Sequence, residues 1–170
     1  MELWDLLDEN RQPTGETHER GLPMPAGRFH VIIGVWTIHD TLRRILVTKR
    51  DPSKKICPNQ WENTGGSLVT GEESCHGAAR EVREETGQPC HCSDLDPIGT
   101  IQIPSAFVDC YIYHTSAPAD SIVLQAGETV DYRWVTIEEL EGFIAEGTFS
   151  EPEIEQFNAC RPFLVRALTQ

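Results

Sequence analysis

The chain has 170 residues, a length typical of one domain and too short for two ordinary domains joined by a linker. Hydrophobic residues make up 39% of the chain and charged residues 24%, which excludes a disordered acidic tail and a fibrous repeat. The 27 Asp and Glu residues outnumber the 14 Lys and Arg residues, and the resulting net charge of −13 argues against a nucleic-acid partner because it repels phosphate backbones.

Neither export nor membrane insertion is expected from the sequence. The first ten residues, MELWDLLDEN, are acidic and lack the basic and apolar segments of a signal peptide. The longest apolar run covers residues 31–36, far short of the ~20 residues that a membrane-spanning helix needs. We therefore expect a cytoplasmic protein with no membrane partner.

The six cysteines are scattered along the chain, at Cys57, Cys75, Cys90, Cys92, Cys110 and Cys160. Without a signal peptide, reduced thiols are their expected state. The run Cys90-His91-Cys92 has no second Cys/His pair at zinc-ribbon spacing. We therefore expect ordinary loop thiols there and no zinc site.

Strands are predicted from runs of alternating, β-branched and aromatic residues. Residues 2–7 alternate, and residues 8–15 have the composition of a turn. Residues 29–38 predict a buried strand, which pairs through a turn near Asp40 with a strand at 44–50. A basic, turn-rich loop at 51–59 follows, and further strands are expected at 98–103, 107–114 and 130–135.

Three helices are predicted. The clearest covers residues 72–86 and is closed by Gly87, with Pro89 just beyond it. A short helix is expected at 137–145, and Pro152, at a first-turn position, opens the last helix at 153–168. Because strands and helices do not alternate regularly, we expect an α/β domain with a mixed sheet and helices on both of its faces.

The segment around the first helix carries the strongest functional signal. It reads Gly66-Ser-Leu-Val-Thr-Gly-Glu72, then seven residues, then Arg80-Glu-Val-Arg-Glu-Glu-Thr-Gly87. At ~100° per residue, three carboxylates share one arc of ~100° on the helix, and Arg83 projects away from them. Such like charges destabilise a helix by a few tenths of a kcal/mol per pair unless a cation binds them, and carboxylates are the ligands that Mg²⁺ and Mn²⁺ prefer. The three carboxylates are Glu81, Glu84 and Glu85.

This segment resembles the Nudix box, and on it the chain resembles the Nudix hydrolase family. The resemblance covers residues 66–88 and departs from the family pattern at its last position, where Gln88 replaces an apolar residue. It implies an α/β/α sandwich with a mixed sheet, formed by the whole chain, residues 1–170, as a single domain. It also implies metal-dependent hydrolysis of a diphosphate linkage in a nucleoside diphosphate derivative or a related small diphosphate.

The resemblance also implies a role for each residue of the box. Glu72 would pair with Arg80 and hold the loop against the helix. Gly65 and Gly66 would let the backbone approach the metal or a phosphate, where a Cβ would clash. The metal ligands, which are also catalytic residues, would be Glu81, Glu84 and Glu85, with Mg²⁺ as the expected ion and Mn²⁺ as the alternative.

The sequence signals for the general base and for the phosphate ligands are less specific than the signal for the metal ligands. Members of the family take the base from the box or from a later loop, and Glu128, before the strand at 130–135, is the candidate outside the box. Lys49 and Arg50 end a strand near the box and are candidate phosphate ligands. Because successive strand residues face opposite ways, we expect only one of the two to reach a phosphate.

A different reaction is the first alternative. The segments DENRQPTGETHERG, SKKICPNQWENTGG and YRWVTIEEL, together with His30, resemble the Nudix branch that includes isopentenyl-diphosphate isomerases. Those enzymes shift an allylic proton and need a cysteine and a histidine-containing metal site. Residues 61–67 contain neither Cys nor His, and His30 is expected to be a structural histidine of a core strand.

A non-catalytic, nucleotide-binding Nudix module is the second alternative. Such a module is expected to have lost acids of the box, whereas here all are present. The expected partner is in each case a small-molecule diphosphate, without nucleic acid or membrane. The sequence leaves a homodimer open as the assembly, because homodimers are the commonest soluble oligomers.

Overall fold

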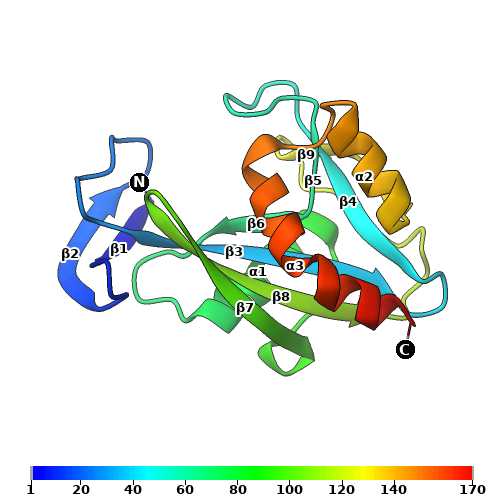
Figure 1. Ribbon diagram of the computed structural model, residues 1–170, viewed down its shortest axis with the longest axis horizontal. Coiled ribbons are helices and arrows are strands. Elements are labelled where there is room, and N and C mark those ends of the chain that lie inside the picture. Colours follow the sequence, from blue (N-terminus) through cyan, green and yellow to red (C-terminus); the bar gives the residue numbers. More distant parts are fainter. Residues whose placement is uncertain (1, 170) are drawn as a thin grey trace.

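A computed structural model of the protein describes residues 2–169. A seven-stranded mixed sheet lies between α1 (Ser74–Thr86) on one face and α2 (Ile137–Ala145) and α3 (Glu151–Thr169) on the other (Figure 1). The expected α/β/α arrangement is therefore confirmed. The short helix is found at the predicted residues, whereas α1 begins two residues later than predicted and α3 two residues earlier. None of the described helices is long and apolar enough to cross a membrane.

The main sheet has the order β5-β4-β3-β8-β7, with β6 paired to β3 and β9 paired to β4. Its strands are β3 (His30–His39), β4 (Arg44–Arg50), β5 (Trp61–Glu62), β6 (Thr64–Ser67), β7 (Leu95–Ile103), β8 (Ala106–Thr115) and β9 (Thr129–Val135). β3 and β8 run parallel, and the other pairs are antiparallel. Ile38 lies opposite Ile45 in the β3–β4 pair, as the turn near Asp40 predicts.

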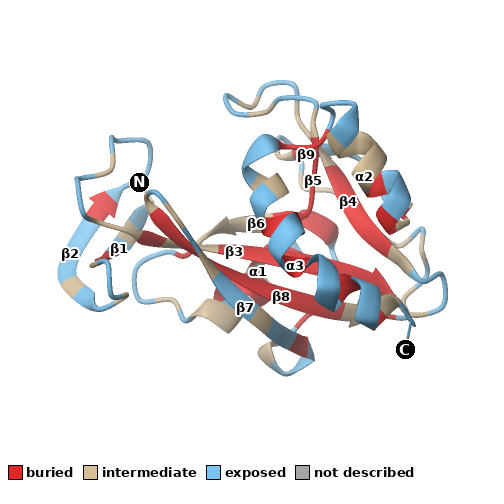
Figure 2. Ribbon diagram, in the orientation of Figure 1, coloured by how far each residue is buried: buried red, intermediate tan, exposed pale blue. Residues whose placement is uncertain are grey.

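Alternation along β3 divides the core into two layers. Ile33 and Val35 pack with α1, whereas Trp36 and Ile38 pack with α2 and α3. Figure 2 shows β3 and β8 buried along almost their whole length, which is why residues 29–38 are hydrophobic on both faces. The pairing of β6 with β3 places the two glycines of β6 within the sheet, opposite residues 33 and 34 of β3.

The N-terminal segment forms a separate hairpin of β1 (Leu3–Leu7) and β2 (Pro13–Glu19). The sequence predicts β1, but the interpretation of residues 8–15 as a turn is wrong from Pro13 onward. β2 was missed because its side chains are almost all exposed or half-buried, so it has no hydrophobic pattern. Asp109 of β8 holds the hairpin turn: it accepts hydrogen bonds from both terminal nitrogens of Arg11, at 2.7 and 2.5 Å.

The end of α1 explains the one departure from the box pattern. Gly87 has φ +69°, and its N–H donates to the Arg83 carbonyl at 3.0 Å, as the predicted C-terminal glycine requires. Gln88 is buried, but its amide nitrogen donates to Ser121 Oγ at 3.0 Å. Its carbonyl oxygen accepts from Thr115 Oγ1 at 3.3 Å. The polar side chain at this position is therefore hydrogen-bonded inside the protein.

The expectation that all cysteines are reduced is wrong for one pair. Cys75 and Cys92 are joined by a disulfide, with their Cα atoms 5.1 Å apart. The cysteines at 57, 90, 110 and 160 are free. The sequence alone does not predict this pairing. After α1 the chain turns back along the helix, and Cys92, the first residue of η1 (Cys92–Asp94), thereby reaches the start of α1.

Candidate active site

The acids of α1 line a cavity of about 240 Å³ between this helix and β6. Glu81 and Glu85 are buried, and Glu84 is exposed. The same cavity is lined by residues 65–67 of β6 and by Gln125 and Glu128 from the loop before β9. The fold thus brings the three predicted metal ligands and the predicted base to one place.

Packing of α1 sets the direction of these acids. Ala78, Ala79 and Val82 are fully or almost fully buried against the sheet. The acids follow on the neighbouring arc of the helix, so they lie along the edge of the buried stripe. Arg83 is exposed, and its Nη1 donates to the Cys90 carbonyl at 2.5 Å. It therefore points away from the acids, as the helical geometry predicts.

Arg80 connects the loop before α1 with the acids. Its Nε and Nη2 donate to the two carboxylate oxygens of Glu72, each at 2.9 Å. Its Nη1 donates to Glu81 at 2.8 Å and to Glu84 at 3.2 Å. The hydrogen bonds that Arg80 donates to Glu72, together with the charge of Glu81, outweigh burial and raise the pKa of Arg80 above its usual value. Glu72 and Arg80 therefore lie together, and the guanidinium also contacts two of the three candidate ligands.

The electrostatics of the cavity fit a divalent cation. Burial, with the neighbouring charges of Glu62 and Glu81 added to it, raises the pKa of Glu85 well above its ordinary value. Burial also raises the pKa of Glu81, although Arg80 opposes this. The Oε2 atom of Glu85 is buried and has no hydrogen-bond partner. A buried carboxylate oxygen of this kind is costly unless a cation or a donor meets it, and oxygen donors suit Mg²⁺ and Mn²⁺.

Gly65 and Gly66 are required by close packing. A Cβ on Gly66 would run into the carboxylate of Glu81. A Cβ on Gly65 would lie 2.5 Å from the Ile33 carbonyl oxygen, which is backbone and cannot move aside. The two glycines thus bring β6 against both the acid-bearing helix and β3, and they leave the backbone of β6 open to the cavity.

Glu128 has a cationic partner. Its carboxylate forms an ion pair with Lys54 of the loop at 51–59, and it is close enough to Glu85 to contribute to the raised pKa of that residue. The loop and the segment before β9 are also joined by a backbone hydrogen bond of 2.9 Å between Asp51 N–H and the Glu128 carbonyl. Lys54 therefore lies next to the candidate base, although the sequence does not distinguish it from other surface lysines.

Lys49 and Arg50 point in different directions, as expected for neighbouring strand residues. Arg50 lines a second cavity of about 260 Å³, which shares residues 65–67 and Arg20 with the first. Lys49 instead lies over the ring of Trp61, with Nζ 5.7 Å from the ring centroid. Of the two predicted phosphate ligands, Arg50 is the one placed beside the candidate site.

The second cavity contains a cluster of buried polar side chains that sequence reasoning missed. Glu62 accepts a hydrogen bond of 2.5 Å from Arg50 Nη1, and burial raises the pKa of Glu62 to about 7. Burial likewise raises the pKa of Glu153. Asn63 donates to Gln156 Oε1 at 2.6 Å. Asn63 Oδ1 and Glu153 Oε2 are buried without a hydrogen-bond partner beside this cavity.

Only part of this cluster had a signal in the sequence. Glu62 and Asn63 directly precede the predicted Gly65-Gly66 turn, a position that could have marked them as neighbours of the site. Arg20 and Glu153 come from the hairpin and from α3, and only the tertiary structure brings them to β6. No local pattern distinguishes them from other exposed charges of the chain.

His30 is a structural residue. Its ring stacks on Trp4 of β1, with ring centroids 4.0 Å apart and an angle of 10° between the planes. Burial lowers the pKa of His30 to about 4, so the ring is neutral at pH 7. It contacts the N-terminal hairpin and is not among the residues that line the acid cavity.

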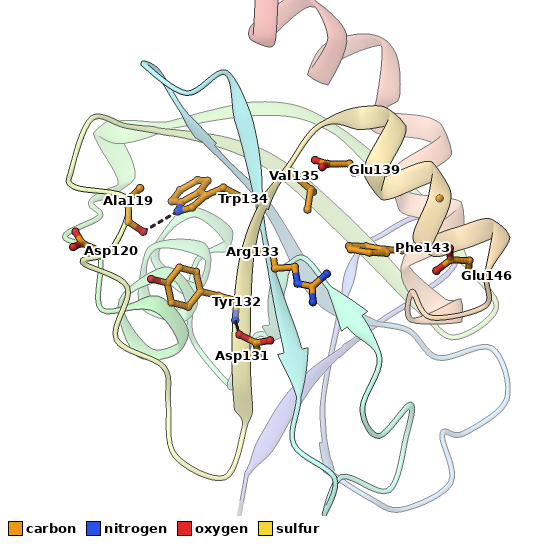
Figure 3. A pocket seen from close by; sticks show the side chains of 11 residues that line it. Ala119, Asp120, Asp131, Tyr132, Arg133, Trp134, Val135, Glu139, Phe143 and Glu146 are labelled. Atoms are coloured by element: carbon orange, nitrogen blue, oxygen red, sulfur yellow. Dashed lines mark hydrogen bonds between the residues drawn. The ribbon is translucent and has the colours of Figure 1, made fainter.

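A larger cavity, of about 840 Å³, is a separate feature on β9 and α2 (Figure 3). Arg133 projects into it and lies over the ring of Trp61, with its guanidinium carbon 4.8 Å from the ring centroid. Trp134 lines the same cavity and donates to the Ala119 carbonyl at 2.9 Å. It contains none of the acids of α1, and the smaller acid-lined cavity is therefore the candidate active site.

Comparison with known proteins shows the family of the chain. The NUDIX domain family model matches residues 28–156. A Nudix hydrolase of Listeria monocytogenes is 37% identical over 150 residues, which cover 88% of each chain. An isopentenyl-diphosphate Delta-isomerase of Salmonella heidelberg is 28% identical over 137 residues, covering 76% of this chain and 74% of that protein.

The solved structures agree on the fold. The crystal structure of DR0079 from Deinococcus radiodurans superimposes with a TM-score of 0.77 at 21% identity, covering 94% of this chain and 98% of that one. The family match spans the sheet, α1 and the first residues of α3. The chain therefore belongs to the Nudix family and is a Nudix pyrophosphohydrolase, related more distantly to isopentenyl-diphosphate isomerases.

Proposed function

We propose that this protein uses a divalent cation, Mg²⁺ or alternatively Mn²⁺, to hydrolyse a diphosphate linkage in a nucleoside diphosphate derivative or a related small organic diphosphate. The observation that carries the proposal is the position of Glu85: it is buried in the acid cavity, beside Glu81, with one oxygen that has no partner. Enzymes of the Nudix family generally use divalent metals. We place this activity in the cytoplasm.

In this proposal, Glu81, Glu84 and Glu85 hold the cation. When bound, the cation would supply positive charge and Lewis acidity toward the diphosphate in a protein of net charge −13. Arg80 Nη1 donates to two of these carboxylates, those of Glu81 and Glu84, and so restricts their rotation. The requirement for the cation is tested by chelation, because turnover should cease in excess EDTA and return with added Mg²⁺.

The substrate is bound by residues around β6. Arg50 lines the second cavity and Arg20 lines both cavities, and each can donate to phosphate oxygens. Residues 65–67 lack bulky side chains and let the phosphates approach the backbone.

Glu128 is the proposed base. A water oxygen forms a bond to one phosphorus atom, the bond from that phosphorus to the bridging oxygen breaks, and Glu128 accepts the proton that the water loses. The ion pair with Lys54 supports this role, because it holds the carboxylate in place at the acid cavity. Glu128→Gln should lower kcat by about 10²-fold, with little change in metal binding.

The isomerase is the alternative that a relative favours, since the Salmonella protein is named as one. Against it, residues 64–67 of β6 contain no cysteine, and His30 is stacked on Trp4. A panel of nucleoside diphosphate derivatives and isopentenyl diphosphate, assayed with Mg²⁺ for phosphate, pyrophosphate and dimethylallyl diphosphate, separates the two reactions. Hydrolysis of any panel member supports the proposal, and isomerisation without hydrolysis contradicts it. Metal-dependent binding without any turnover would indicate the non-catalytic module.

A further inference from the structure

The first turn of α1 is fastened to the segment that follows this helix. Cys75 is the second residue of α1 and Cys92 is the first residue of η1, and the disulfide between them spans 17 positions of sequence. The covalent loop encloses nearly the whole of α1, including Arg80 and the three candidate metal ligands. This one bond therefore restrains the element that carries the acid site.

The two bonded cysteines are the pair best placed to react. Both are half-buried, so a small thiol or disulfide can reach them, whereas Cys90, Cys110 and Cys160 are buried. Burial raises the pKa of Cys90 to about 11, which keeps this thiol protonated although it lies only two residues from Cys92. Cys57, in the loop at 51–59, is the other accessible thiol and is free.

Cys92 lies in a groove of about 660 Å³ that is lined by Arg80, Arg83, His76 and His91 and by one carboxylate, Glu72. Arg80 holds Glu72 at two points, whereas Arg83 donates to a backbone carbonyl and forms no ion pair with the described residues. An arginine beside a cysteine favours its thiolate, which is the form that attacks a disulfide. The same cation favours the approach of an anionic reagent such as glutathione.

We propose that Cys75 and Cys92 form a reversible thiol–disulfide site that exchanges with low-molecular-weight disulfides of the glutathione class and fastens the acid-bearing helix when oxidised. One protein thiolate attacks glutathione disulfide, which forms a mixed disulfide and releases one glutathione thiolate. The second protein thiolate attacks the protein sulfur of the mixed disulfide and releases the second glutathione. Two protein thiols are oxidised and one glutathione disulfide is reduced to two thiols, with two electrons and two protons transferred.

Oxidation should stabilise the protein measurably. A covalent loop of this length restricts the unfolded chain, and the melting temperature of the reduced protein should be roughly 6–12 °C lower than that of the oxidised protein. The amides of α1 and of residues 87–94 should exchange with solvent faster after reduction, because the helix loses its anchor at Cys92. Amides of β3 and β8 should change less.

The test uses the full chain equilibrated with mixtures of reduced and oxidised glutathione. Free thiols are alkylated under denaturing conditions, the protein is digested, and the peptides are identified by mass spectrometry. We expect a Cys75–Cys92 linked peptide whose fraction rises with the oxidised share and falls again on reduction. The melting temperatures of both states are measured on the same preparation, so this comparison needs no variant.

Two variants and a zinc measurement complete the experiment. The double variant Cys75→Ser/Cys92→Ser should melt at the same temperature with and without reductant, and Cys57→Ser should keep the response of the wild type.

Cys75, His76 and Cys92 have donor atoms within 4.8 Å of one another, so zinc content is determined as well. Equimolar zinc with both thiols reduced would overturn the proposal, as would pairing of Cys92 with Cys90. No linked peptide at any glutathione ratio would overturn it too. None of these readouts depends on hydrolytic activity.

Discussion

Arg80 and Glu72 form a two-point ion pair in which Nε and Nη2 of the arginine donate to the two carboxylate oxygens, each at 2.9 Å. Glu72 precedes α1 and Arg80 lies in its middle, so the pair fixes the entering loop to the helix. The third nitrogen, Nη1, contacts Glu81 and Glu84. The geometry of the loop and the direction of two candidate metal ligands thus depend on one guanidinium.

Arg80→Ala should therefore lower both stability and activity. Glu72 would lose its partner while mostly buried, which should cost about 2–3 kcal/mol, and the two ligands would lose a donor. Arg83→Ala is the matched control, because Arg83 is exposed and makes one hydrogen bond, to the Cys90 carbonyl. Thermal unfolding and kcat/KM of both variants test this. Equal damage by the two substitutions would contradict the assigned role of Arg80.

Glu85→Gln should separate stability from metal binding. Without metal the substitution removes a buried carboxyl whose ionisation is disfavoured, so the variant should melt at or above the wild-type temperature. With Mg²⁺ the wild type should gain stability and the variant should not, and its kcat/KM should fall by at least ~10²-fold, or ~2.7 kcal/mol. Glu155→Gln, on an exposed face of α3, is the control and should respond to Mg²⁺ as the wild type does. A full Mg²⁺ response in Glu85→Gln would exclude Glu85 as a ligand.

Glu62 should make stability depend on pH between about 4.5 and 7. Burial raises its pKa to about 7 in the folded protein from 4.5 in the unfolded chain, so the folded state binds the extra proton in this window. The contribution to stability is fully present below pH 4.5 and is lost as pH rises through 7, by up to about 3 kcal/mol. Urea unfolding of wild type and Glu62→Gln, in EDTA at several pH values, measures the difference. A difference that stays constant across this window would rule out the assigned pKa.

Asp109 should hold the N-terminal hairpin in place. Burial alone would raise its pKa, but hydrogen bonds from Arg11, Ser74 and Thr100 outweigh burial and lower it. Asp109→Asn should cost about 3 kcal/mol at pH 7, and this difference should begin to shrink as pH falls below the ordinary pKa of 3.8, because the unfolded chain takes up a proton there before the folded carboxyl does. Asp96→Asn, exposed on β7, is the control. Unfolding by urea at pH 7 and pH 3.5 checks both points.

The three carboxylates of α1 could be predicted because the sequence pattern that places them lies within one helix. Helical periodicity places Glu81, Glu84 and Glu85 on one arc and Arg83 on another, whatever the rest of the fold does. The strands β3, β4, β8 and β9 were predicted to within one residue at each end, because they are rich in apolar and β-branched residues. The short strands β5 and β6 were not predicted, and β7 begins three residues earlier than predicted. The prediction of the helix ends was two residues off at α1 and α3, where the sequence alone does not show which turn first packs.

The rest of the site depends on contacts between distant segments. Arg20, Glu62 and Glu153 meet around one cavity only after the hairpin, β5 and α3 have packed together. The disulfide has the same origin, since the chain must return along α1 before its cysteines meet. The prediction missed β2 for a different reason. This strand pairs through its backbone while most of its side chains are exposed or half-buried, so its sequence has no hydrophobic alternation.

The most direct test of the central claim is hydrolysis of the diphosphate panel by wild-type protein and by Glu85→Gln, in Mg²⁺ and again in excess EDTA. We expect the wild type to release phosphate, pyrophosphate or a nucleoside monophosphate only with Mg²⁺, and the variant to be at least ~10²-fold slower on the same substrate. Wild-type turnover that persists in EDTA, or a variant as fast as the wild type in Mg²⁺, would contradict the account.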